Sequence, residues 1–296
     1  DRDYAGVGRK NVAFKRSGNG GKNETASING KDSRNAYNRA ESGNGISGID
    51  GNRFELLKGR KTRMSKVRTI FLKQIKDTIK NKAVFIQFVL LPLMAVIMEN
   101  AVEIKDMPKH FFVLMFSAMY VGMAPLSCIS AIISEEKETG TLGMLRMSNV
   151  KAWEYLAGTG FCVFALCMAG GCVFVWAGEY KGWRIGVFLG ILAVGILISM
   201  FIGAIIGLMS NNQMGATSVT VPVTMVFSFL PMLSFFNEKI REIAKFVYSY
   251  QIQDALGRIR ETEGMKELIR GGRYEILAVN LLLAAALFGF VYKRCR

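Results

Sequence analysis

The feature that most constrains the fold is residues 185–237, a run of 53 positions without one charged side chain. A helix needs about 20 predominantly apolar residues to cross the hydrocarbon core of a bilayer. The run is therefore long enough for two membrane spans, and a water-soluble fold could not cover so much apolar surface. The sequence predicts a polytopic membrane protein and excludes a soluble globular domain.

Apolar windows with little charge predict an all-α fold with six transmembrane helices. They lie near residues 83–102, 111–134, 157–178, 186–209, 216–236 and 276–292. The first is marginal, because only residues 83–98 are free of charge, which is about 24 Å of helix for a core about 30 Å thick. The polar residues 210–215 divide the long uncharged run, so the fourth and fifth spans should form a short helical hairpin.

An amphipathic helix is predicted over residues 65–82, immediately before the first span. Its apolar residues recur every three or four positions, and its lysines fall mostly on the opposite side. The apolar positions are Val67, Ile70, Phe71, Ile75 and Ile79. Because a membrane span follows directly, this pattern favours a helix at the membrane surface over an ordinary helix packed on a soluble core.

Residues 1–63 are a different kind of sequence, with 14 basic and 7 acidic residues among Gly, Asn and Ser. Such a segment has too few apolar residues to form a core, which predicts a disordered basic tail. Because the first methionine is Met64, we interpret the tail as dispensable or as no part of the functional protein, and residues 64–296 as the transmembrane domain. The Gly-Lys pairs in the tail lack the upstream glycine of a Walker phosphate loop.

Composition disfavours several kinds of chemistry. The only histidine is His110, and none of the five cysteines forms a C-x-x-C pair, so neither a metal nor another cofactor is expected in this chain. The net charge of +15 could suggest nucleic acid, but basic residues crowd next to the first span, which favours membrane lipid as the partner. Six basic residues precede that span within residues 64–82, and only Lys105 and Lys109 follow it, so both ends should be cytoplasmic.

The most informative stretch follows the second predicted span. An acidic cluster, Glu135, Glu136 and Glu138, ends the helix, and Gly140 breaks it. A short amphipathic helix then places Leu142, Leu145 and Met147 on an apolar surface beside Arg146. A projection of this kind suits docking into a groove of another protein, and a solvated loop is the alternative interpretation.

This stretch resembles the permease subunits of type-two ABC exporters, which move drugs, peptide antibiotics, lipids, polysaccharides or ions outward. Members typically carry Glu-Glu-Lys-Glu-x-Gly-Thr-Leu after the second span, matched here by residues 135–142. An x-Leu-x-x-(Ser/Thr)-x-Val run follows, approximated by residues 144–150, with Asn149 where many members have proline. The resemblance covers residues 64–296 and includes the helix before the first span, the six spans and the basic C-terminus.

The resemblance implies that residues 141–148 form a coupling helix seated in a cleft of a separate ABC ATPase subunit, which would bind the ATP and Mg. The acidic cluster would meet basic residues of the ATPase or of the helix before the first span. The residues expected to couple are Glu135, Glu136, Glu138, Gly140, Thr141, Leu142, Leu145 and Arg146. The resemblance further implies a second permease copy or a similar permease, a location in the prokaryotic cytoplasmic membrane, and short helices after the fifth span, where Ile240, Ile243, Val247 and Tyr250 have helical spacing.

Two other functions stay open on the sequence alone. A membrane-embedded enzyme would need paired carboxylates near the interface, for which Glu135 and Glu136 are the only candidates. A non-transporting scaffold or sensor could use the basic tail as its interaction element. No carboxylate lies at the centre of a span, which disfavours an ion-driven carrier, and the uncharged spans favour an amphiphilic or lipid-like cargo over a polyanion.

Overall fold

The computed structural model describes residues 67–102, 109–147, 151–261 and 274–294. The predicted tail, residues 1–63, and the last residue of the predicted coupling helix, Ser148, lie outside the described residues. Every regular element in the described part is a helix. These are the helix Val67–Lys80, α3 (Lys82–Ala101), α4 (Phe111–Glu138), α5 (Thr141–Met147), α6 (Ala152–Ala177), α7 (Trp183–Met209), α8 (Gln213–Phe236), α9 (Glu238–Ala244), α10 (Tyr248–Glu261) and α12 (Tyr274–Arg294).

Among the described residues, five helices are each long and apolar enough to cross a membrane: α4, α6, α7, α8 and α12. Helix α3 meets this criterion only together with the helix Val67–Lys80, from which it is bent by 68°. This is the span that the sequence marks as short. Each of the six predicted windows falls on one of these helices, and the prediction of an all-α polytopic membrane protein is confirmed.

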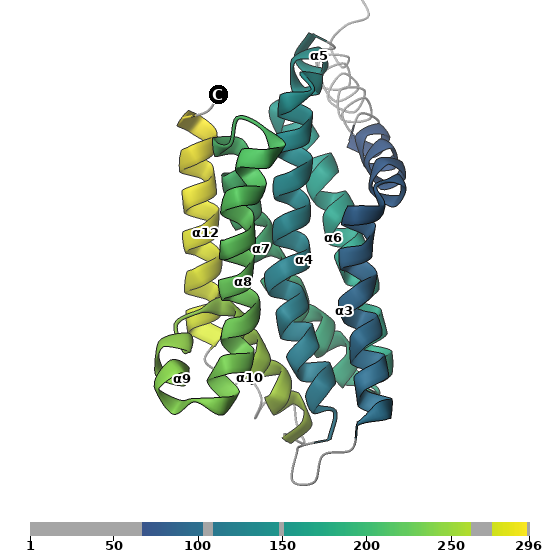
Figure 1. Cartoon of the computed structure of the whole chain (residues 1–296), viewed down its shortest axis with the longest axis vertical. Coiled ribbons are helices and arrows are strands. Elements are labelled where there is room, and N and C mark those ends of the chain that lie inside the picture. The colour runs from purple at the N-terminus through teal and green to yellow at the C-terminus, as the bar shows by residue number, and fades with distance from the viewer. Residues whose placement is uncertain (1–66, 103–108, 148–150, 262–273, 295–296) are drawn as a thin grey trace, which may run out of the picture. The chain divides into compact units, whose positions relative to one another are not determined.

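Helix α4 is the central helix of the bundle (Figure 1). It packs against α3, α6, α7, α8 and α10, and most of its apolar length is buried, whereas α12 lies at the periphery and packs mainly on α7. Helices α4 and α7 approach closely at Gly203 and Gly207, where an added Cβ would lie 2.3 Å from the Leu126 carbonyl oxygen and 3.0 Å from that of Ser130. This glycine pair therefore serves packing within the bundle.

Several polar side chains inside the spans join helices to one another. The Ser130 hydroxyl of α4 lies 2.8 Å from that of Thr220 in α8. The Ser199 hydroxyl of α7 donates to the Val121 carbonyl of α4 at 2.6 Å and lies 2.8 Å from the Tyr248 hydroxyl of α10. Such bonds contribute about 0.6 kcal/mol each on average within membranes, so they fix helix positions more than they add stability.

The segment after α8 forms two short helices, as the resemblance implies. The residues with helical spacing, Ile240, Ile243, Val247 and Tyr250, do not form one continuous apolar face. Ile243 is 70% exposed, because the chain turns between α9 and α10 and the helical spacing does not continue across that turn. The buried face of α10 is instead built from Tyr248, Ile252, Leu256 and Ile259, and it packs among α4, α7, α8 and α12.

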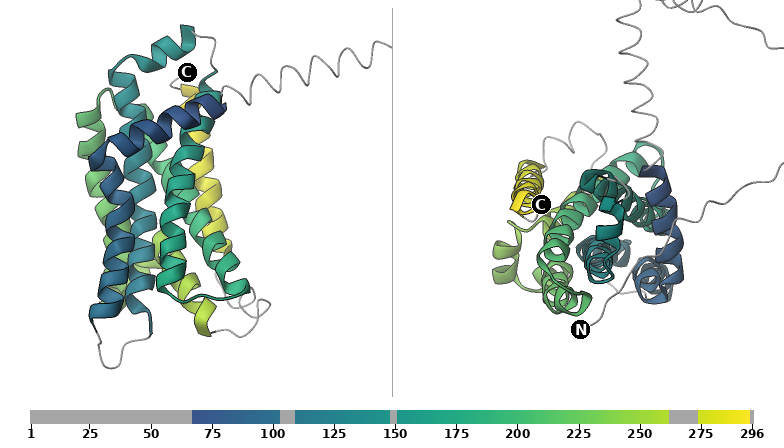
Figure 2. Two further views of the ribbon diagram at one scale, coloured as in Figure 1. Left: turned by 90° about the vertical axis from the view of Figure 1, so that its right-hand side faces the viewer. Right: turned by 90° about the horizontal axis from the view of Figure 1, so that it is seen from above.

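The helix Val67–Lys80 also differs in detail from its predicted face. Its buried stripe is Ile70, Gln74 and Thr78, whereas Ile79 is 51% exposed. The reason is that the helix lies across the bundle, so that its buried side faces α6 and is partly polar. The approach is close, since a Cβ added at Gly158 of α6 would lie 2.8 Å from the Ile70 side chain. Figures 1 and 2 place this helix, α5 and the C-terminal end of α12 at one end of the bundle, opposite α9 and the end of α10.

Candidate functional site

The predicted docking segment forms a projecting helix at the end of α4. Helix α4 continues through the acidic cluster to Glu138, and Gly140 then takes a φ of +71°, a left-handed conformation that side chains disfavour. The Thr139 hydroxyl donates to the Glu135 carbonyl and lies 2.9 Å from the Thr141 hydroxyl across this turn. Helix α5 therefore begins in a new direction and extends past the end of the bundle (Figure 1).

Glu136 connects α4 to the helix Val67–Lys80. The Lys73 ammonium donates to Glu136 Oε1 at 3.0 Å, with the carboxylate side chain only 11% exposed and the lysine side chain 46% exposed. The predicted contact between the acidic cluster and the helix before the first span is thus present. The other oxygen, Glu136 Oε2, is buried near the Tyr155 hydroxyl of α6 without forming a hydrogen bond of normal geometry.

Lys137 and Glu138 hold the hairpin between α7 and α8. The Lys137 ammonium donates to the carbonyl oxygens of Leu208 at 2.9 Å and Ser210 at 2.7 Å, at the end of α7. Glu138 Oε2 accepts a hydrogen bond of 2.7 Å from the backbone N–H of Gln213, the first residue of α8. The cation meets the negative end of one helix dipole and the carboxylate meets the positive end of the next. Glu138 thus contacts a helix N-terminus of its own chain.

The remaining predicted site residues fall into two groups. Glu135 is exposed on α4 and pairs with no cation among the described residues, so it is accessible to a partner. On α5, Met144 is 55% and Met147 is 82% exposed, which leaves an apolar surface on the projecting helix. The side chains of Leu142, Leu145 and Arg146 lie outside the described part of the structure, so their docking face stays a prediction.

Sequence reasoning missed Lys137 and the identity of the lysine that pairs with Glu136. The break between α7 and α8 is visible in the sequence, and a helix end attracts a cation or an anion. Nothing in the spacing shows that the charges would come from α4, because Lys137 and Ser210 lie far apart along the chain. These bonds join the helix Val67–Lys80, the end of α7 and the start of α8 to the last turn of α4, from which α5 projects.

The ion pair between Lys73 and Glu136 leads to the first prediction. Lys73→Met keeps the apolar stem and leaves the mostly buried carboxylate without its cation, which should cost about 1–2 kcal/mol because the lysine is half exposed. We expect the unfolding midpoint of the permease in detergent to fall by about 2–4 °C. The control is Lys76→Met, which changes an exposed lysine of the same helix. An equal shift in both variants would mean that the ion pair contributes nothing specific.

Comparison with known protein families gives a match to the family described as ABC-2 family transporter protein, over residues 23–292. The matched region includes all of the described helices except the last two residues of α12, and it begins within the segment predicted to be a tail. No curated protein matches the chain at a significant level.

Proposed function

This chain belongs to the ABC-2 family of transporter proteins, and on that premise we propose that it works with a separate ATPase subunit, to which α5 docks. The family assignment makes the chain a membrane permease of an ABC exporter. In the proposed complex the ATPase binds ATP and Mg, and the permease carries the substrate path. Two ATPase subunits and a second permease, identical or similar, complete the exporter.

The observation that carries this proposal is the position of α5. It projects from the most central helix of the bundle, beyond a glycine whose φ of +71° redirects the chain. Its base is joined to the helix Val67–Lys80 by the Lys73–Glu136 pair and to the α7–α8 hairpin by Lys137 and Glu138. A force applied to α5 therefore reaches α4 and its neighbours as one body.

This connection supports a rigid-body mechanism. Closure of the ATPase dimer moves α5, and α4 tilts with it because its last turn is bonded on both sides. The hairpin follows through Lys137 and Glu138, and the helix Val67–Lys80 follows through Glu136. The helices that surround the path then move together to the outward-open state.

The enzyme alternative finds less support. It requires Glu135 and Glu136 to act as a pair, but Glu135 is exposed, whereas Glu136 is buried and bonded to Lys73. We further propose that the protein resides in a prokaryotic cytoplasmic membrane with both ends in the cytoplasm. The helix Val67–Lys80, α5 and the end of α12 then share the cytoplasmic side, as their common end of the bundle requires (Figure 2).

The division of labour is tested with the purified permease. Because the sequence contains no Walker phosphate loop, the permease alone should neither bind nor hydrolyse ATP. Addition of its ATPase subunit in lipid vesicles should produce ATP turnover that depends on both proteins. Nucleotide turnover by the permease in isolation would overturn the proposal, and the absence of any copurifying ATPase would favour the scaffold or sensor alternative.

A further inference from the structure

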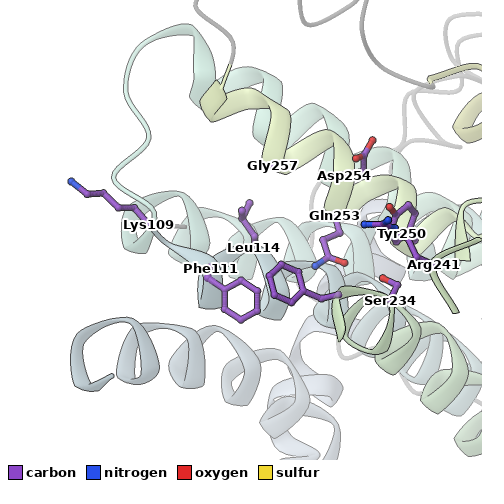
Figure 3. A pocket seen from close by; sticks show the side chains of 10 residues that line it. Lys109, Phe111, Leu114, Ser234, Arg241, Tyr250, Gln253, Asp254 and Gly257 are labelled. Atoms are coloured by element: carbon purple, nitrogen blue, oxygen red, sulfur yellow. The ribbon is translucent and has the colours of Figure 1, made fainter. Parts of the chain in front are cut away.

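A second site is present at the end of the bundle opposite α5. A cavity of about 470 Å³ lies between the start of α4, the end of α8, α9 and α10 (Figure 3). This volume falls in the range of small-molecule sites, about 300–1,000 Å³. None of the residues predicted for coupling lines it, so the cavity is separate from the site described above.

One side of the cavity is apolar. Phe111 and Leu114 come from the first turns of α4, and Phe235 comes from the last turn of α8. The rings of Phe111 and Phe235 have their centroids 4.7 Å apart, and Phe111 continues into a buried cluster with Met115 and Met119. This side can hold a hydrocarbon chain or ring out of water.

The other side of the cavity is polar. Arg241 of α9 and Tyr250 and Gln253 of α10 line it, and Figure 3 shows the Gln253 side chain extending from α10 toward the start of α4. Gln253 Oε1 is buried and has no hydrogen-bond partner among the described residues. This oxygen is an acceptor and gives no hydrogen bond to an anion, whereas the amide NH2 of the same side chain is a donor from which an anion can accept.

The local charge on this side is positive. A smaller adjoining cavity shares Arg241, Tyr250 and Asp254 with the first and adds Lys245 and Arg258. The carboxylate that lines both cavities, Asp254, accepts a hydrogen bond of 2.9 Å from Arg258, which offsets its charge. Arg241 pairs at 3.2 Å with Glu238, whose side chain is 89% exposed, so that pairing is weak and can be exchanged for a ligand anion.

We infer that this cavity binds an anionic amphiphile, with its carboxylate or phosphate at Arg241 and the amide NH2 of Gln253 and its apolar part against Phe111 and Phe235. A guanidinium presents a planar set of donors that matches these anions, and the adjoining lysine and arginine increase the potential. The outward-facing location of the cavity rests on the proposed function, but binding itself does not. The ligand is either exported cargo or a lipid of the membrane.

The charge requirement is tested by direct binding to the purified full-length permease in phosphatidylcholine nanodiscs. The probes are radiolabelled oleate and oleyl alcohol, which share a hydrocarbon chain and differ in charge. Arg241→Gln should weaken oleate binding about tenfold or more and leave oleyl alcohol unchanged, since a charge-assisted hydrogen bond is lost. The control is Lys239→Gln, which removes a positive charge from an exposed position of the same helix outside the cavity.

Three further variants separate binding from folding. Gly257 lines the cavity on α10, and a Cβ added there meets no atom within 4 Å, so Gly257→Leu should fill the space, block oleate and leave the unfolding midpoint unchanged or raised. Gly289→Leu on α12, where an added Cβ also meets nothing within 4 Å, should not affect oleate binding. Gln253→Leu should weaken binding because the amide donor is lost, and it should not reduce stability, because the amide oxygen has no partner among the described residues.

The inference fails if oleate and oleyl alcohol bind equally well, or if Lys239→Gln weakens oleate as much as Arg241→Gln does. Retention of oleate binding by Gly257→Leu would also overturn it. The source of the ligand is read from a separate assay on the complete complex. Cargo should stimulate ATP turnover, whereas a resident lipid should copurify as phosphatidylglycerol and leave turnover unchanged. Failure of the complex to form would contradict the proposed function and leave these binding results standing.

Discussion

Replacing Leu142 with Asp is expected to abolish binding of the ATPase subunit while the permease still inserts into the membrane. If the leucine fills an apolar groove of the partner, the substitution places a charge in that contact. Burying an unpaired carboxylate costs several kcal/mol, which corresponds to a loss of affinity of about a thousandfold or more. Leu145→Asp should have the same effect, because the two residues lie three positions apart on α5 and share a face. The measurement is copurification of the ATPase at equal permease abundance.

Two control variants accompany this prediction: one keeps an apolar side chain on α5, and the other changes a residue outside α5. Leu142→Met keeps a side chain of similar volume and should retain the partner. Lys151→Ala changes an exposed residue just before α6 and should have little effect on partner binding. If Leu142→Asp and Leu145→Asp both keep the ATPase and its stimulated turnover, α5 is a solvated element and the proposed docking loses its residue-level support.

The helices could be predicted from the sequence because membrane insertion leaves a strong local signal. A window such as residues 186–209 is uncharged throughout, and the corresponding helix α7 begins at Trp183 and ends at Met209. The start of α5 was also predictable, because Gly140 follows an acidic helix end and can adopt a positive φ. Helix α4 extends four residues beyond its predicted window, because charged residues end an apolar span without ending the helix.

The parts that escaped prediction depend on contacts between distant residues. The hydrogen bond from Lys137 to Ser210 and the approach of Lys73 to Glu136 require the packing of three helical segments to be known first. The cavity at the opposite end is built in the same way, since Phe111 and Arg241 come together only when α9 turns back toward the start of α4. Hydrophobic periodicity reports which side of a helix avoids water and contains no information on its neighbours.

The turn at Gly140 gives the last prediction, in which partner binding persists and coupling is lost. Proline fixes φ near −65°, whereas Gly140 has a φ of +71°, and proline also removes the N–H that donates to the Lys137 carbonyl at 3.3 Å. Gly140→Pro should therefore redirect α5 relative to α4 while the sequence of α5 stays intact. We expect the ATPase still to copurify, with its substrate-stimulated turnover in lipid vesicles falling to the unstimulated level.

The neighbouring glycine supplies the matched control for this effect. An added Cβ meets no atom within 4 Å at either Gly140 or Gly143, but only Gly140 has a positive φ. Gly140→Ala should therefore cost about 1–2 kcal/mol through backbone strain and lower stimulated turnover, whereas Gly143→Ala should leave turnover unchanged or improve α5 slightly. Equal turnover in Gly140→Pro, Gly140→Ala and the unmodified permease would show that the direction of α5 does not matter. Closure of the ATPase dimer would then not move the bundle through α5 and the contacts of Glu136, Lys137 and Glu138.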